Sequence, residues 1–112
     1  MIADSRTSVA FTGHRTYRGA AADALRRTVG ELYARGFRNF LSGMAVGFDL
    51  AAAEAVLELR ERAPGVRLVA AVPFRGQEMR FSPADRERFR RVLAEADSVE
   101  VLAPAYHRGC YA

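Results

Sequence analysis

Glycine residues that could bind a phosphate follow an apolar run in the middle of this sequence. Residues 40–59 read FLSGMAVGFDLAAAEAVLEL, so the run passes through Ser42, Gly43 and Gly47 into an alanine-rich segment. Glycines between a strand and a helix N-terminus let backbone N–H groups approach an anion, which the helix dipole also attracts. The spacing is neither GxGxxG nor the P-loop pattern, so it matches no standard nucleotide fingerprint.

Structural roles for the same residues stay open. Gly43 can end the strand in a positive-φ turn, and Gly47 can let the next helix pack close to the sheet. Asp49 either serves the helix dipole as a first-turn acid or accepts a hydrogen bond from a ribose hydroxyl. Glu54, a carboxylate among alanines, needs a partner. That partner is either a structural arginine or a ligand group such as a ribose or base, with general-base chemistry as a lesser option.

A second set of polar residues follows the first apolar run, VAFT. Gly13 ends this run and is followed directly by His14 and Arg15. Arg15 can clamp a phosphate, and His14 can donate a hydrogen bond or titrate. The alternative for His14 is a turn residue that caps the loop.

A third set lies in the segment PFRGQEMRF. Phe74 and Phe81 can stack on a base, while Gln77 and Arg80 contact the edge of the base or a phosphate. The alternative for the two aromatic side chains is a place in the hydrophobic core.

Strand and helix patterns alternate along the chain and position these residues. Apolar runs predict strands over residues 7–13, 38–43, 66–74 and 98–104, and 3.6-residue periodicity predicts helices over about 20–35 and 46–62. Gly36 stands where a helix C-cap is expected. A third helix should begin with Ser82 as its N-cap, Pro83 at its first position and Asp85 at its third.

This alternation predicts the α/β class, with a Rossmann-like three-layer sandwich around a parallel sheet. We expect the strand order 3-2-1-4, with helices on both faces of the sheet. A ligand crevice would then lie at the carboxyl ends of the strands, between strands 1 and 4.

Composition limits the class of protein. The 112 residues are half hydrophobic and contain no apolar run of 18 residues, so we expect a single soluble, cytoplasmic domain over residues 1–112 and no membrane partner. A lone cysteine, Cys110, forms no internal disulfide, and no spacing of Cys and His suggests a metal site. The net charge of +4 comes with no clustered basic stripe, so nucleic acid is a less favoured partner.

Taken together, the motifs resemble the YpsA-like branch of the SLOG superfamily, which also contains the LOG enzymes and the DprA/Smf proteins. VAFTGHR, FLSGMAVGFDLAAAEAVLELR, VAAVPFRGQEMRF and DRERFRRVLAEAD, followed by YHRGCYA, carry the resemblance from about Val9 to Ala112. It implies a nucleotide-binding fold that binds or senses a nucleotide-derived ligand such as ADP-ribose, NAD or AMP, with no other cofactor required and no established reaction. By motif, the implied site residues are Gly13, His14, Arg15, Ser42, Gly43, Gly47, Asp49 and Glu54.

Two other functions follow from the wider superfamily. A LOG-type enzyme would use Glu54 and Arg15 to cleave the N-glycosidic bond of a nucleoside monophosphate, and a DprA-type protein would bind DNA. Proteins that resemble this one continue past RGCYA through another helix and strand, so we expect the domain to be incomplete at its C-terminus. We also expect a second copy or a partner chain to cover the edge of the fourth strand.

Overall fold

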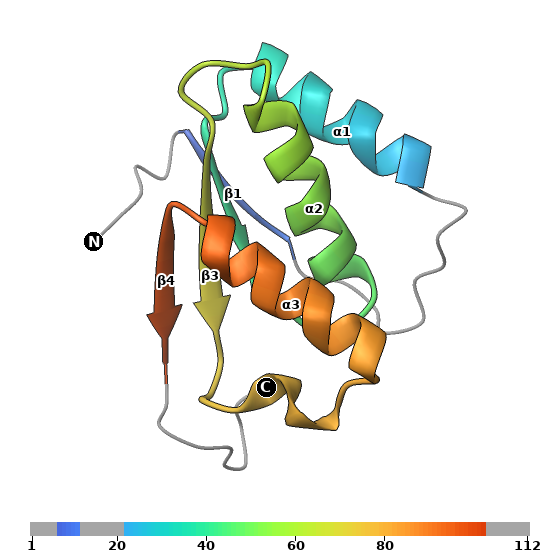
Figure 1. Ribbon diagram of the computed structural model, residues 1–112. Helices are drawn as coiled ribbons and strands as arrows, with labels where there is room; N and C mark the ends of the chain where they lie inside the picture. Colours follow the sequence, from blue (N-terminus) through green and yellow to red (C-terminus); the bar gives the residue numbers. More distant parts are fainter. Residues whose placement is uncertain (1–6, 12–21, 103–112) are drawn as a thin grey trace.

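The computed structural model describes residues 7–11 and 22–102, which form a parallel sheet with helices packed on it (Figure 1). The elements in chain order are β1 (Ser8–Phe11), α1 (Ala22–Ala34), β2 (Asn39–Ser42), α2 (Phe48–Arg60), β3 (Arg67–Val72), the 3₁₀ helix η2 (Gln77–Arg80), α3 (Pro83–Glu95) and β4 (Ser98–Val101). The predicted α/β class and parallel sheet are confirmed.

The strand order is β1-β2-β3-β4, so the predicted order 3-2-1-4 was wrong. Right-handed crossovers allow either order, and contacts between distant residues decide between them. Here Asp97, just before β4, ties the chain to β3. Its N–H donates to the Leu68 oxygen at 2.9 Å, and its Oδ2 accepts from Leu68 N at 2.7 Å and Arg60 Nη1 at 2.8 Å. β4 therefore lies beside β3, and the expected crevice between strands 1 and 4 does not form.

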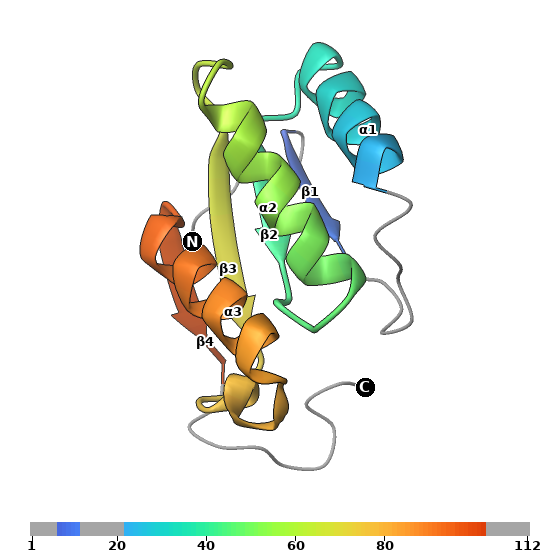
Figure 2. The ribbon, with the colours of Figure 1, turned by 45° about the vertical axis from the view of Figure 1, so that its right-hand side comes forward.

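All three α-helices lie on one face of the sheet (Figure 2). Each connection leads from one strand to the next strand in the same direction across the sheet. Because every such crossover is right-handed, its helix lies on the same face of the sheet. Within the described residues the architecture therefore has two layers, and the second helical layer that we expected is not among them.

The hydrophobic core fills the space between the sheet and the helices. Phe40, Leu68 and Ala70 from the strands are completely buried against Leu50 and Val56 of α2. The remaining buried core residues include Leu25, Val29, Val72, Phe89 and Val92. None of the helices in the described part of the chain is long and apolar enough to cross a membrane.

Local signals set the helix ends. Gly36 follows α1 with φ of 104°, and Phe37 N donates to the Leu32 oxygen at 3.0 Å, which closes the helix end. Ser82 caps α3 as predicted, because its Oγ accepts from Asp85 N at 3.2 Å and Pro83 is the first helical residue.

Candidate ligand site at the carboxyl ends of the strands

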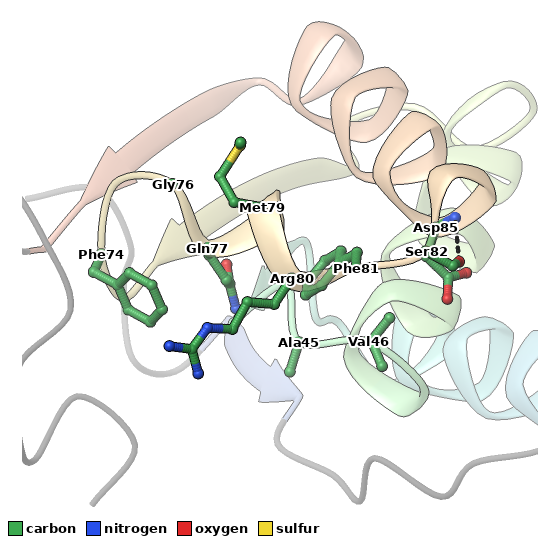
Figure 3. A pocket seen from close by; sticks show the side chains of 10 residues that line it. All are labelled: Ala45, Val46, Phe74, Gly76, Gln77, Met79, Arg80, Phe81, Ser82 and Asp85. Carbon is green, nitrogen blue, oxygen red and sulfur yellow. Dashed lines mark hydrogen bonds between the residues drawn. The ribbon is translucent and has the colours of Figure 1, made fainter.

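A cavity of about 480 Å³ lies beyond the carboxyl ends of β2 and β3 (Figure 3). Its walls come from the loop after β2, from the loop that contains η2 and from the start of α3. A volume of this size falls in the range of small-molecule sites. The lining residues are Ala45, Val46, Phe74, Gly76, Gln77, Met79, Arg80, Phe81, Ser82 and Asp85.

Four residues that the sequence suggested for ligand contact line this cavity: Phe74, Gln77, Arg80 and Phe81. Arg80 is exposed, and the structure shows no hydrogen bond or ion pair between its guanidinium and any described residue. Figure 3 shows Met79 pointing away from Arg80, so the two neighbours leave η2 on different sides. Arg80 is therefore a positive charge available to an anion at the mouth of the cavity.

Gln77 connects the two loops that form the cavity. It is 3% exposed, and its Nε2 donates to the Gly43 oxygen at 3.3 Å. Gly76, with φ of 86°, turns the chain into η2 and brings Gln77 to this position. Gln77 thus lines the cavity and, through its amide, ties the loop after β3 to the loop after β2.

Ser42 fastens the glycine-containing loop to α2. Its Oγ accepts from Met44 N at 3.1 Å and donates to the Asp49 oxygen at 2.9 Å. The positive-φ conformations fall on Met44, with φ of 66°, and on Gly47, with φ of 95°, and not on Gly43. Gly47 is the N-cap of α2, so its conformational freedom sets the entry to that helix.

Gly43 makes room for a side chain. A Cβ on Gly43 would lie 3.0 Å from Asp49 Oδ2, and Asp49 is only 6% exposed. The residues of this region that line the cavity are Ala45 and Val46, and the lining does not include Ser42, Gly43, Gly47 or Asp49. The positive-φ turn considered for Gly43 is therefore wrong, and its contacts show a close approach to the Asp49 carboxyl group instead.

Glu54 is paired with an arginine of α3. Arg88 Nη2 lies 2.7 Å from Glu54 Oε1 and Arg88 Nε lies 2.9 Å from Glu54 Oε2, while Arg88 Nη1 donates to Asp85 Oδ1 at 2.9 Å. The hydrogen bonds to Glu54 raise the pKa of Arg88 further above its usual value, against the effect of partial burial. Glu54 is absent from the cavity lining, and its partner is the structural arginine among the alternatives considered above.

Positive groups border the cavity on several sides. The N-terminal ends of α2 and α3 both border it, through Val46 and Ser82, and each carries partial positive charge. Arg80 adds a full positive charge, whereas Asp85 brings a negative charge to the lining and shares its ion-pair partner Arg88 with Glu54. Among residues 7–11 and 22–102, no group of three or more His, Cys, Asp or Glu side chains is placed to hold a metal ion.

Comparison with known families gives a match over nearly all of the chain. Residues 9–111 match the sequence profile of the YspA SLOG family. The chain belongs to the YspA SLOG family. The family resemblance predicted from the four motifs is confirmed.

Relatives of this YspA SLOG domain include proteins of several bacilli. The UPF0398 protein BH1768 of Halalkalibacterium halodurans is 29% identical over 86 residues, which are 77% of this chain and 46% of that protein. A UPF0398 protein of Bacillus pumilus is 33% identical over 76 residues, 68% of this chain and 41% of its own. The matched stretch is thus less than half of each relative, and neither name states an activity.

Several cavity-lining residues of the YspA SLOG domain were not predicted from the sequence, and three predicted site residues lie outside the described part of the chain. Ala45, Val46, Gly76 and Met79 line the cavity, but small or flexible apolar side chains carry no signal of a site. Ser82 and Asp85 were recognised only as helix-capping residues. The predicted residues Gly13, His14 and Arg15 lie outside the described residues.

Proposed function

We propose that this YspA SLOG domain binds a nucleotide-derived ligand of the ADP-ribose, NAD or AMP type in the cavity between the loop after β2 and η2. The observation that carries the proposal is the position of Arg80, an arginine without a described partner, at a cavity bordered by two helix N-termini. Arginine offers a planar set of donors that suits phosphate oxygens.

The rest of the lining suits the apolar part of such a ligand. Phe74, Phe81, Ala45 and Val46 supply aromatic and aliphatic surface, which a base can contact. Phe81 also makes an edge-to-face contact with Phe89, with ring centroids 5.6 Å apart, so the core holds its ring in place.

Titration calorimetry with ADP-ribose, NAD and AMP tests the proposal, using the whole 112-residue chain and two charge-matched variants. Arg80→Gln removes the guanidinium at the cavity. Arg67→Gln removes an exposed guanidinium from the start of β3, at the amino-terminal end of the strands, whereas the cavity lies at their carboxyl ends. We expect Arg80→Gln to weaken binding by about tenfold or more, because a charged hydrogen bond is lost, and Arg67→Gln to leave it unchanged. Binding that is equally strong in all three proteins would place the ligand elsewhere, and absence of binding to the parent would refute the proposal.

Two added assays distinguish the other functions known in the superfamily. Release of free base from AMP, lost in Glu54→Gln but kept in Arg88→Gln, would indicate a LOG-type hydrolase with Glu54 in a chemical role. Affinity for DNA that falls steeply with rising salt would instead indicate a DprA-type protein, because each phosphate contact releases counterions.

A further inference from the structure

The cavity between the loop after β2 and η2 carries a carboxylate as well as an arginine. Asp85 lines it at the start of α3, and its side chain is 31% exposed. In the described part of the chain, Asp85 forms an ion pair with Arg88 at 2.9 Å and none with Arg80. The cavity therefore presents two charges of opposite sign that are not paired with each other.

These two charged groups lie at different places in the lining. Figure 3 shows the Arg80 side chain extending toward Phe74, whereas Asp85 lies on the side of Val46, with the Phe81 ring between them. The edge-to-face contact of this ring with the core keeps it in that place. A ligand that contacts both charged groups must therefore reach across the Phe81 ring.

The carboxylate of Asp85 keeps room for a further hydrogen bond. Two carboxylate oxygens together offer about four acceptor positions. Oδ1 accepts from Arg88 Nη1 at 2.9 Å, and among residues 7–11 and 22–102 the structure shows no hydrogen bond to Oδ2. A hydroxyl or amino group of a ligand can donate to this oxygen, whereas a second phosphate group would be repelled by its charge.

Building on the proposed function, we infer that Asp85 selects the nucleoside end of the ligand. A nucleoside 5′-monophosphate unit binds with its phosphate at Arg80, and a neutral hydrogen-bond donor of its sugar or base reaches Asp85. This donor is a ribose hydroxyl or an exocyclic amino group, and both present the same chemistry to a carboxylate. Asp85 is thus a specificity residue for ligands that combine an anionic end with a neutral donor.

Titration calorimetry with AMP and two analogues tests the inference and identifies the donor. 2′,3′-Dideoxy-AMP lacks the ribose hydroxyls, and IMP lacks the amino group of the base. The parent chain should bind at least one analogue about tenfold more weakly than AMP, because a hydrogen bond to a charged acceptor is lost. In Asp85→Ala the difference between AMP and that analogue should disappear. If Asp85 served only to hold α3 in place, both affinities would fall together and their ratio would stay the same.

Glu87→Ala is the matched control for Asp85→Ala. Glu87 is an exposed carboxylate of the same helix, and its contact with Arg91 is 3.9 Å long. This variant should keep the affinity of the parent for AMP and the ratio between AMP and the analogue.

The inference can fail while the proposed function stands. A ratio that persists in Asp85→Ala, or a parent chain that binds AMP and both analogues equally, would overturn the role of Asp85 even if binding still depends on Arg80. Binding of NAD or ADP-ribose without measurable binding of AMP would also overturn it, because the monophosphate unit would then be insufficient. A parent chain that binds none of these nucleotides would refute the proposed function and this inference together.

Discussion

The carboxylate of Asp49 occupies the space that a side chain at position 43 would need. The Gly43 Cβ position lies 3.0 Å from Asp49 Oδ2, and the whole Asp49 residue is buried. Asp49 is also fixed through its backbone, because its oxygen accepts from Ser42 Oγ. A new methyl group at Gly43 would therefore press on a charged group with little room to move.

Gly43→Ala should lower the free energy of unfolding by about 1–3 kcal/mol, the usual cost of overpacking. Urea denaturation measures the change. Gly30→Ala is the control, because nothing lies within 4 Å of a Cβ on Gly30 and alanine is the better helix former within α1. That variant should be more stable than the parent by about 0.5–1 kcal/mol. An unchanged stability of Gly43→Ala would show that Asp49 adapts freely.

Residue roles were predictable where a general rule of the fold applied. Phe74, Gln77 and Arg80 lie close together because they belong to the one segment that follows β3, and this segment meets the loop after β2 because parallel strands end on the same side of the sheet, whatever their order. The partner of Glu54 was not predictable, because Arg88 follows it by 34 residues and lies on another helix. No local pattern reports a contact of that kind.

At the scale of elements, Arg88 joins the middle of α2 to the start of α3. It binds Glu54 through two nitrogens and Asp85 through the third, and the side chains of the Arg88–Glu54 pair are about one third exposed. Asp85 also lines the cavity, so this contact ties one cavity wall to α2.

A double-mutant cycle with Glu54→Gln and Arg88→Met should give a coupling energy of about 1 kcal/mol, since the pair is bidentate but only partly shielded from water. The cycle of Glu87 and Arg91, which lie 3.9 Å apart and are largely exposed, should give about 0.5 kcal/mol or less. The raised pKa of Arg88 means that its charge is lost only at pH above the usual arginine range. We therefore expect the coupling to persist from neutral into alkaline pH; equal couplings for the two pairs would contradict a special role for Arg88.

Element boundaries follow from local chemistry, and the sequence predicts them well. The helices predicted over about 20–35 and 46–62 begin and end within two residues of α1 and α2. Ser82 and Pro83 predict the start of α3, because capping depends only on neighbouring backbone groups.

At the scale of the whole molecule, strand order depends on contacts that no local pattern encodes. The hydrogen bonds of Asp97 to Leu68, together with its ion pair to Arg60, hold β4 against β3. A periodicity of apolar residues gives the number and type of strands but does not specify which edge receives the next one.

Nuclear Overhauser contacts between backbone protons test the order directly. We expect contacts between Ala70 and Val99 and between Phe40 and Leu68, because these residues are register partners. We expect none between β1 and β4, which lie at opposite edges of the described sheet. Contacts between Val9 and Val99 would instead support the order 3-2-1-4 and refute the arrangement described above.

The consecutive order of the strands has a consequence for how the chain folds during synthesis. Each strand from β2 to β4 pairs with the strand translated just before it. The strand that it pairs with has therefore already been synthesised when the new strand leaves the ribosome. The first unit, from β1 to β2, can close before β3 or β4 has been translated, and no strand must be inserted between two others. The entropy cost of loop closure is thus divided among three short β-to-β connections, each closed in a separate step. The described sheet grows in the direction of translation, and β4 is the last of the described strands to join it.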